Sequence, residues 1–391
     1  MVLPRHLSLC LAVCAFVSAT AFTEYNSEIN TAIEEIRQAN NFTAALDSYQ
    51  DYLIGSSAAP DPLNIQRVSG TDYDRPGQMR GFYSDNGIWK PTQGHLDSRS
   101  FIYNTLGSMN LHSVSYQDVT ADGYSNARNI IGRINGKDTS KAVVIGAHYD
   151  ATAQRSSDSQ RYNYGGSDNA TGVAGVLEIA RVLSQSKYEF DYCIEFVLFD
   201  TEESRDGWGV GSSHYAANSQ DTIAGMASLD MIGYNHNAEN TAKLFRKSSE
   251  YGGEFISVME SVIDDYQLGL NAKTGTSEWS DHNAFDIDNA GLLIEDVDGG
   301  FPPYNPYYHK YEDYIINENY DYNLSYEANI ANGSVQMYNG IQYIDMQYAA
   351  EMTKLALGWA AYSANLTVVP EPAAILILGL GSLILRRRKS A

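Results

Sequence analysis

The stretch KAVVIGAHYD, residues 141–150, sets the expectation for the fold. Its apolar run from Ala142 to Ala147 is short and unbroken, which is typical of a strand buried on both faces of a sheet. The run stops at His148-Tyr149-Asp150, where groups that bind metals or move protons replace the apolar side chains. In α/β proteins such groups gather just beyond the carboxyl ends of parallel strands.

The sequence on either side of this strand alternates between short apolar runs and longer helical patterns. Strands are predicted at NIIGRI, CIEFVLF, MASLDMI and AGLLIED, which are residues 129–134, 193–199, 226–232 and 290–296. Helices are predicted over residues 171–184, which Asn169 would cap, and over residues 212–218 and 251–266. Strands that alternate with helices predict an α/β fold, with a mixed, mostly parallel sheet flanked by helices on both faces.

Acids and histidines recur after these predicted strands and in glycine-flanked or tyrosine-rich stretches between them. In chain order they are His148, Asp150, Asp168, Glu202, Glu203, Asp230 and His309. Because the carboxyl ends of parallel strands meet at one edge of a sheet, we expect these side chains to converge. Carboxylate oxygens and imidazole nitrogens in a fixed cage are what a hydrolytic site for divalent metal ions requires.

At this point the sequence resembles a known family, the co-catalytic dizinc exopeptidases typified by secreted bacterial leucyl aminopeptidase. The resemblance runs from about Arg128 to Asp313, nearly half of the chain. It rests on motifs that occur in this order: VVIGAHYDAT, GGSDNATGVAGVLEIAR, VLFDTEE with GSSHYA downstream, SLDMIGYN, SDHNAF and NPYYHKYED.

By position, the resemblance implies a site for two Zn²⁺ ions per chain. Asp168 would bridge the two ions. His148 and Asp230 would complete one site, and Glu203 and His309 would complete the other. In such a site, the two ions share a water and lower its pKa toward about 7.

The same resemblance assigns two further residues. Asp150 would orient His148 from behind, as metal-bound imidazoles usually require. Glu202, next to a ligand but not itself one, would be the general base that takes a proton from water and passes it to the leaving amine. The expected function is therefore that of a zinc-dependent metallo-exopeptidase, an aminopeptidase that hydrolyses N-terminal residues of peptide substrates.

Two other functions remain open on the same fold. One is a glutaminyl cyclase, with a single working zinc and no release of an amino acid. The other is a catalytically silent surface or matrix protein. A binding protein has no need to keep Glu202 beside Glu203, which argues against the second alternative.

The chain also departs from the family pattern. The loop after Glu203 reads SRDGWGV and is about two residues longer than expected. Ser277 stands where relatives carry a tyrosine that helps the oxyanion, and this segment has no cysteine for the disulfide that accompanies it. Lys310 follows His309 where a threonine is usual. These departures leave the shape of the pocket open and predict either another oxyanion donor or lower activity, with every implied metal ligand present.

Several other residues are expected to be structural. His282 in SDHNAF is predicted to be a hydrogen-bonded framework residue, and His214 and His236 to lie on the surface or in packing contacts. Cys193 opens an apolar run and is predicted to be a small buried hydrophobe. The tyrosines clustered at residues 304–326 are expected either to line a rim for peptide side chains or to form a solvated loop.

The chain is predicted to have four parts. Residues 22–55 and 96–111 have helical patterns, whereas residues 56–95 are rich in Gly, Pro, Ser and Asp and are expected to be irregular. The parts are a signal peptide (1–21), an N-terminal segment packed on the core (22–125), the zinc peptidase catalytic domain (126–366) and a sorting tail (367–391).

The N-terminus has the features of a secretory signal. Arg5 precedes an apolar stretch from Leu7 to Val17, and Ala19-Thr20-Ala21 forms an A-x-A cleavage signal. A lipoprotein cysteine at Cys14 is disfavoured, because the apolar stretch before it would be very short. We expect an exported protein.

The C-terminus resembles a PEP-CTERM sorting tail. Pro370-Glu371-Pro372 is followed by 13 apolar or small residues, Ala373–Leu385, and then by the basic cluster Arg386–Lys389. The apolar run is shorter than the roughly 20 residues of a comfortable bilayer span. The resemblance implies transient anchoring in an inner membrane, cleavage by a sorting protease, and release to the surface or exterior of a Gram-negative bacterium. The alternative is an ordinary single-pass transmembrane tail anchor.

The composition limits the partners of the chain. It carries 48 acidic and 26 basic residues, a net charge of −22. A surface of this sign repels nucleic acid and anionic membranes, so neither is expected as a partner. Once the signal peptide is removed, Cys193 is the only cysteine, so the exported protein would rely on its core or on bound metal for robustness.

Overall fold

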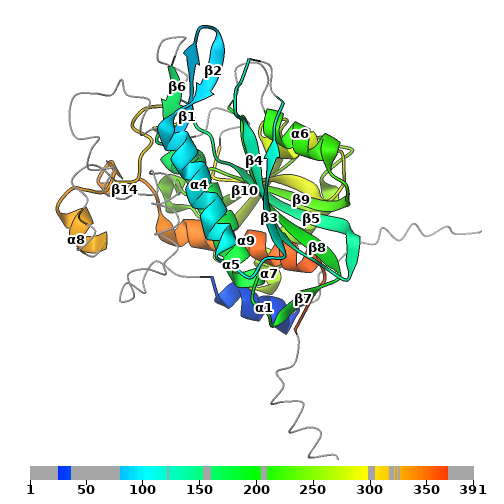
Figure 1. The fold of residues 1–391 in the computed structure, drawn as a ribbon. Helices are drawn as coiled ribbons and strands as arrows, with labels where there is room; N and C mark the ends of the chain where they lie inside the picture. The colour runs from blue at the N-terminus through cyan, green and yellow to red at the C-terminus, as the bar shows by residue number, and fades with distance from the viewer. Residues whose placement is uncertain are drawn as a thin grey trace, which may run out of the picture.

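The structure is a computed structural model of the full chain, and part of the chain is described. The described residues are 25–36, 80–120, 123–152, 160–203, 209–297, 304–316, 321, 324 and 326–368. The predicted signal peptide, most of the predicted sorting tail and residues 56–79 of the segment expected to be irregular lie outside them. Figure 1 shows the arrangement of the helices and strands.

An eight-stranded sheet forms the centre of the molecule, in the order β11-β10-β12-β9-β5-β8-β4-β3. The pairs β5–β8, β5–β9, β9–β12 and β10–β11 are parallel, and the pairs β3–β4, β4–β8 and β10–β12 are antiparallel. The mixed, mostly parallel sheet predicted from the sequence is confirmed. The strands are β3 (Ser113–Asp118), β4 (Arg128–Ile134), β5 (Asp138–His148), β8 (Tyr192–Phe199), β9 (Thr222–Asp230), β10 (Thr241–Arg246), β11 (Asn271–Thr276) and β12 (Ala290–Ile294).

The central strands are buried on both faces, and their side chains alternate between two apolar layers. Val143 and Ile145 of β5 belong to the larger cluster, whereas Val144 between them belongs to a smaller cluster on the opposite face. β8 alternates in the same way, with Phe196 in the larger cluster and Val197 in the smaller one. This double burial is why both strands have unbroken apolar sequences.

Helices cover both faces of this sheet, as predicted. The larger apolar layer contains residues of five helices, and α6 packs on the opposite face, where Tyr215 joins the smaller cluster (Figure 1). The five are α1 (Ser27–Glu34), α4 (Gln93–Gly107), α5 (Gly172–Leu183), α7 (Gly253–Asp265) and α9 (Met346–Ser363), while α6 is Val210–Asn218. The predicted helix at residues 96–111 begins and ends a few residues early. Whether residues 22–125 form a unit separate from residues 126–366 stays a prediction.

A small three-stranded sheet, in the order β2-β1-β6, stands beside α4 (Figure 1). It consists of β1 (Arg80–Asp85), β2 (Ile88–Pro91) and β6 (Gln160–Asn163). The prediction of irregular structure is therefore wrong for residues 80–91. The missed signal is Asn86-Gly87, whose positive φ angles of 54° and 82° are the two-residue turn that joins antiparallel strands.

The remaining elements are short. β7 (Tyr188–Phe190) pairs with β15 (Leu366–Val368), and β13 (Met337–Tyr338) pairs with β14 (Ile341–Gln342). The helix α8 spans Tyr326–Ala331. Among the described residues, no helix is both long and apolar enough to cross a bilayer.

The helix α9 was not predicted from the sequence, although it packs against α1, α5 and α7 in the core. Nearly all of its side chains are buried, including Leu355 and Trp359, which are fully inaccessible to solvent. A helix buried on all sides has no polar face, so it lacks the periodic pattern by which surface helices are recognised.

We expect Leu355→Ala to lower the free energy of unfolding by about 2–5 kcal/mol, since it leaves a cavity in the core. The control is Ile341→Ala, because Ile341 is 61% exposed and its truncation should change stability by no more than about 0.5 kcal/mol. Denaturant unfolding of both variants measures the difference. Equal stability of the two would contradict the core position of α9.

Candidate metal centre

Three of the predicted site segments meet at the carboxyl ends of adjacent strands. β5 ends at His148, β9 ends at Asp230, and Glu202-Glu203 follows β8. Because β5 is the parallel neighbour of both β8 and β9, the ends of these strands lie side by side. The sheet thus places four of the candidate residues at one edge: His148, Glu202, Glu203 and Asp230.

Asp168 reaches the same edge from a turn that precedes α5. The turn spans Gly166–Thr171, and the Asp168-Asn169 peptide bond within it is cis. The amide of Asn169 attaches the turn to the end of β9, donating to the carbonyl of Leu229 at 2.8 Å and accepting from the N–H of Met231 at 3.1 Å. The asparagine expected to cap α5 also accepts from the N–H of Gly172 at 2.9 Å.

The two histidines and three carboxylates form two lobes that share Asp168. In one lobe, Nε2 of His148 lies 3.3 Å from Oδ1 of Asp168 and 3.3 Å from Oδ1 of Asp230. In the other, Nε2 of His309 lies 3.2 Å from Oδ2 of Asp168 and 2.9 Å from Oε1 of Glu203. Asp168 therefore presents one carboxylate oxygen to each lobe, which is the position of a bridging ligand.

The carboxylate of Asp150 supports this arrangement from behind. Its two oxygens accept the main-chain N–H groups of Glu202 at 3.1 Å and Glu203 at 3.0 Å. Oδ1 of Asp150 also lies 3.5 Å from Nδ1 of His148, and the main-chain oxygen of Asp150 lies 3.3 Å from the same nitrogen. Asp150 is thus placed where it can orient the imidazole, and its role stays a prediction.

A second supporting carboxylate, Asp313, was not singled out from the sequence. It accepts the main-chain N–H of Ser167 at 2.7 Å and of Asp168 at 3.1 Å, and the hydroxyl of Tyr343 at 2.9 Å. Burial raises its pKa to about 7, despite these hydrogen bonds. Its position four residues after His309 is the only local signal that could have drawn attention to it.

The main chain is strained where it delivers the candidate ligands. Thr201, Met231 and His309 have φ angles of 55°, 52° and 53°, in the left-handed region. This region is unfavourable for residues with a Cβ, by roughly 1–2 kcal/mol each. Residues held in such conformations by their surroundings are common at functional sites.

The donor set fits divalent metal ions. Asp168, Glu203, Asp230 and both histidines are at most 5% exposed, and Oε2 of Glu203 is buried without a hydrogen-bond partner among the described residues. The ligand atoms of His148, Asp168 and Glu203 lie within 4.8 Å of one another. Two imidazoles and three carboxylates at this spacing are the ligand types that zinc prefers.

The electrostatics of the cluster also favour a cation. Burial disfavours the charged imidazolium, but the surrounding carboxylates outweigh it, raising the pKa of His148 well above its usual value and that of His309 to about 10. Burial in turn raises the pKa of Glu203 to about 7. A bound divalent cation would neutralise the carboxylates while leaving both imidazoles neutral, as ligation requires.

Glu202 lies beside the cluster and outside both lobes. It is 5% exposed, and its carboxylate forms no ion pair with a described residue. Burial raises its pKa well above the usual value, and the neighbouring carboxylates of Glu203 and Asp281 add to this, against the opposing effect of His148. A buried carboxyl group of raised pKa beside a metal centre is suited to proton transfer.

The three histidines expected to be structural lie outside the cluster. Nε2 of His282 lies 2.8 Å from the carbonyl oxygen of Ser277, and burial lowers the pKa of His282 to about 4, so it is a neutral framework residue, as predicted. His214 lies half-buried on α6, and His236 stacks on Tyr304 with ring centroids 4.1 Å apart.

The tyrosines after residue 303 lie in different environments, and a rim for peptide side chains stays a prediction. Tyr307 packs edge-on against Tyr343, with ring centroids 4.8 Å apart, in a small apolar cluster. Tyr308 stacks on His309 with ring centroids 3.7 Å apart, whereas the side chain of Tyr304 is 41% exposed. The stretch is therefore partly packed and partly at the surface. Of the lengthened loop after Glu203, residues 204–208 lie outside the described residues.

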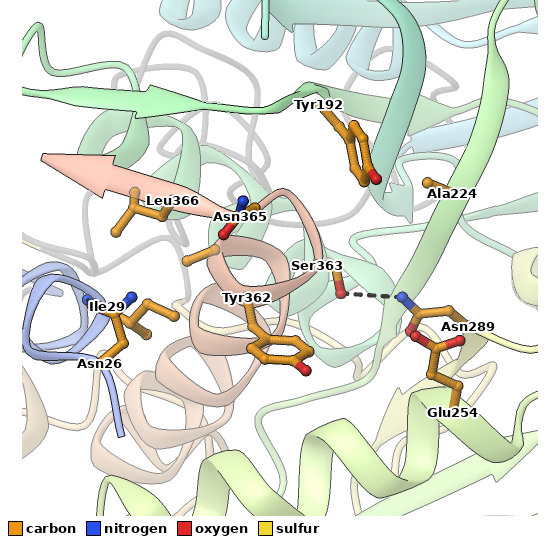
Figure 2. Close-up of a pocket in the computed structure, with 11 residues that line it drawn as sticks. Asn26, Ile29, Tyr192, Ala224, Glu254, Asn289, Tyr362, Ser363, Asn365 and Leu366 are labelled. Carbon is orange, nitrogen blue, oxygen red and sulfur yellow. Dashed lines mark hydrogen bonds between the residues drawn. The ribbon is translucent and has the colours of Figure 1, made fainter. Parts of the chain in front are cut away.

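A groove of about 620 Å³ lies at the opposite end of the sheet (Figure 2). It is lined by Tyr192, Ala224 and Asn289, which lie at the beginnings of β8, β9 and β12, and by residues of α1 and the end of α9. None of the candidate ligands lines it. The groove lies at the beginnings of these strands, whereas the candidate ligands lie at or beyond the ends of strands, so the groove is separate from the candidate metal centre.

Comparison with solved structures shows the same fold. The chain superposes on the *Legionella pneumophila* LapA aminopeptidase with a TM-score of 0.60 at 20% identity, covering 93% of this chain and 80% of that one. It also resembles a Zn-dependent exopeptidase from *Parabacteroides distasonis* (TM-score 0.55, 19% identity, 82% and 100% covered). A *Bacteroides thetaiotaomicron* glutaminyl cyclase is similar as well (TM-score 0.52, 17% identity, 80% and 96% covered).

Sequence comparison identifies the family. The chain is 31% identical over 188 residues to the uncharacterized protein YfbL of *Escherichia coli* (strain K12), which is 46% of this chain and 56% of that protein. The match thus spans little more than half the length of that relative. Residues 129–333, more than half of the chain, match the model of peptidase family M28 and include every candidate ligand. The chain belongs to peptidase family M28.

Proposed function

We propose that the protein is a zinc-dependent exopeptidase that acts as an aminopeptidase on peptides. The observation that carries the proposal is the position of Asp168, with one carboxylate oxygen facing His148 and the other facing His309. A carboxylate shared between two ligand sets is the arrangement of a two-metal hydrolytic site. Membership of peptidase family M28 supports peptide hydrolysis as the reaction.

Five side chains would hold two zinc ions. His148 and Asp230 would bind one, Glu203 and His309 the other, and Asp168 both. Zinc bound there would supply Lewis acidity toward the scissile carbonyl and lower the pKa of the attacking water. The orphaned oxygen of Glu203 and the burial of all five side chains support this assignment.

Glu202 is proposed as the general base. It is adjacent to Glu203 in sequence but belongs to neither lobe, so its carboxylate is available for protons. Main-chain hydrogen bonds to Asp150 hold Glu202 and Glu203 in place. Glu202 would take a proton from the attacking water and return it to the nitrogen of the leaving amine.

The lack of a basic side chain paired with the candidate ligands favours amino ends over carboxyl ends. Among the described residues, no lysine or arginine forms an ion pair with Asp168, Glu203 or Asp230. A carboxypeptidase needs a cation to receive the terminal carboxylate of its substrate. In the proposed site the zinc ions would neutralise the carboxylates, and one of the ions could hold a free α-amino group of the substrate.

We further propose that the protein is exported. The support is the signal-like sequence of residues 1–21 and the tail at residues 367–391, which would anchor the chain transiently until a sorting protease cleaves it. An acidic chain with a single cysteine after removal of the signal peptide is consistent with an extracellular location.

The first prediction concerns metal content and substrate. The purified protein should bind two zinc ions per chain and release amino acids from substrates with a free α-amino group, but not from N-acetylated analogues. Chelation should abolish turnover, and added zinc should restore it, because the metals supply the Lewis acid. Elemental analysis and assays with paired free and blocked substrates test this.

Two outcomes would contradict this prediction. One zinc per chain, with cyclisation of N-terminal glutamine and no amino acid released, would indicate a glutaminyl cyclase. No zinc and no turnover would indicate a silent surface or matrix protein on the same fold.

The second prediction concerns the base. Glu202→Gln should lower kcat by about 10²–10⁴-fold, because the amide cannot accept the proton. Zinc content should be unchanged, since Glu202 lies outside both lobes. The matched control is Glu254→Gln, which makes the same change in the groove at the far end of the sheet and should leave kcat intact. Substantial residual hydrolysis by Glu202→Gln would refute its role.

A further inference from the structure

Arg80, the first residue of β1, is buried in an unusual way. Its side chain is fully inaccessible to solvent, and no carboxylate of a described residue lies within 4.0 Å of it. Its guanidinium donates instead to three main-chain carbonyls: Nε to Tyr164 at 3.1 Å, Nη1 to Tyr149 at 3.1 Å, and Nη2 to Gly165. Buried arginines are rare unless paired, so this one needs an explanation.

The three carbonyls belong to two loops that carry candidate ligands. Tyr149 lies between His148 and Asp150, and Gly165 lies three residues before Asp168. Arg80 therefore bridges the loop that begins at the end of β5 and the loop that leads into the bridging carboxylate. Since the two loops are connected through one planar guanidinium, their separation is fixed by its geometry.

The local sequence is adapted to this contact. Gly165 has a φ angle of +60°, and a Cβ there would overlap with Nη2 of Arg80. The carbonyl of Gly165 also accepts the N–H of Ala170 at 2.9 Å, which closes the turn that contains Asp168. Only glycine combines this conformation with so close an approach.

A second residue of the small sheet extends the bridge to a third loop. Asn163 of β6 is the register partner of Arg80 on β1. Its fully buried amide nitrogen lies 2.7 Å from the carbonyl of Thr152 and 3.3 Å from that of Lys310, which follows His309. Arg80 and Asn163 together thus contact the loops of His148, Asp168 and His309.

The charge of Arg80 is compensated by the metal centre itself. Burial lowers its pKa to about 10, against the attraction of Asp313, Asp150 and Asp168, so the guanidinium stays protonated at neutral pH. Asp168 is a candidate ligand, and the other two carboxylates support the ligand loops. The cation therefore lies behind the ligands and offsets part of their mutual repulsion.

We propose that Arg80, together with Asn163, is a positioning residue of the metal centre, which sets the spacing between the loops of His148, Asp168 and His309 and thereby the affinity for the metals. The inference rests on the proposed function in taking the ions to be zinc and the reaction to be peptide hydrolysis. It extends the metal centre to residues that bind neither metal nor substrate.

Lysine and methionine at position 80 separate the two contributions of Arg80. Lysine keeps the positive charge but replaces the planar fork by one ammonium, which cannot reach three carbonyls in the same geometry. Methionine removes both the charge and the donors while retaining much of the volume. A positioning role predicts that lysine already impairs the site, whereas a purely electrostatic role predicts that lysine is tolerated.

The experiment uses the full chain with Arg80→Lys, Arg80→Met and Asn163→Ala. Zinc affinity is measured by competition with a chelator, ligand geometry by the visible absorption of the Co²⁺-substituted protein, and kcat and KM with an aminoacyl substrate. We expect Arg80→Lys to weaken zinc binding or lower kcat by about 10–100-fold, as changes to residues behind metal ligands do, with KM nearly unchanged and an altered Co²⁺ spectrum. Asn163→Ala should act in the same direction.

The matched control is Arg133→Lys. Arg133 is also largely buried and donates to a main-chain carbonyl, that of Thr139, but it lies on β4 and pairs with Glu195 and Asp221, away from the ligands. Arg133→Lys is expected to lower stability and to leave zinc affinity and the Co²⁺ spectrum as in the parent protein.

Native zinc affinity, Co²⁺ spectrum and kcat in Arg80→Lys would overturn the proposal. If both Arg80 variants fail to fold, native values in Asn163→Ala overturn it, and reduced affinity there supports it. Failure of the proposed function is distinguishable, because it appears in the parent protein as absent peptide hydrolysis. The affinity and spectrum of the variants test the positioning role in that case too.

Discussion

The rest of the structure depends on the repulsion among carboxylates buried at one edge of the central sheet. Asp168, Glu203 and Asp230 each lie within 3.3 Å of at least one imidazole nitrogen, and their side chains are at most 7% exposed. Burial raises the pKa of Glu203 to about 7, and the neighbouring carboxylate of Asp168 adds to this, against the opposing effect of His309. The fold holds them there with opposing groups: imidazoles in front, main-chain N–H donors and Arg80 behind, and, in the proposed function, metal ions between.

How much of the fold the sequence predicts depends on how each element is buried. The strands at Ala142–Ala147 and Cys193–Phe199 are recognisable because burial on both faces leaves an unbroken apolar run. β10 and β11 were not predicted, because β11 (NAKTGT) is largely exposed and neither strand has a strong apolar pattern. α9 was not predicted for the opposite reason, since a helix buried all round shows no periodicity. Strand order depends on contacts between distant residues, which local patterns do not contain.

The candidate site divides in a similar way. His148 and Glu203 can be found from sequence because each follows a predicted strand, and Asp230 because it lies near the end of one, where strand ends converge. Asp168 and His309 lie outside the predicted strands, so strand ends do not position them, and their roles as ligands followed from the resemblance to a family. Apart from Asp150, whose role the resemblance implied, the supporting contacts could not be predicted. The carboxylate of Asp313 accepts a hydrogen bond from the N–H of Asp168, 145 residues earlier in the chain. Arg80 donates hydrogen bonds to the carbonyls of Tyr149 and Gly165, 69 and 85 residues later in the chain.

These contacts between residues far apart in sequence add residues to the candidate site that local patterns do not indicate. The match to peptidase family M28 begins at residue 129. Two arginines that precede residue 129 nevertheless donate hydrogen bonds to Tyr149, the neighbour of His148. Arg80 donates to its carbonyl, and Arg99 of α4 donates to its hydroxyl at 2.9 Å and to the buried Asp200 at 3.1 Å. Buried guanidinium groups are costly without nearby negative charge, and buried carboxylates are costly without nearby positive charge. Arg80 and Arg99 and the carboxylates at the strand ends therefore stabilise each other. The candidate metal centre thus includes contacts from residues that precede the segment matched to the family.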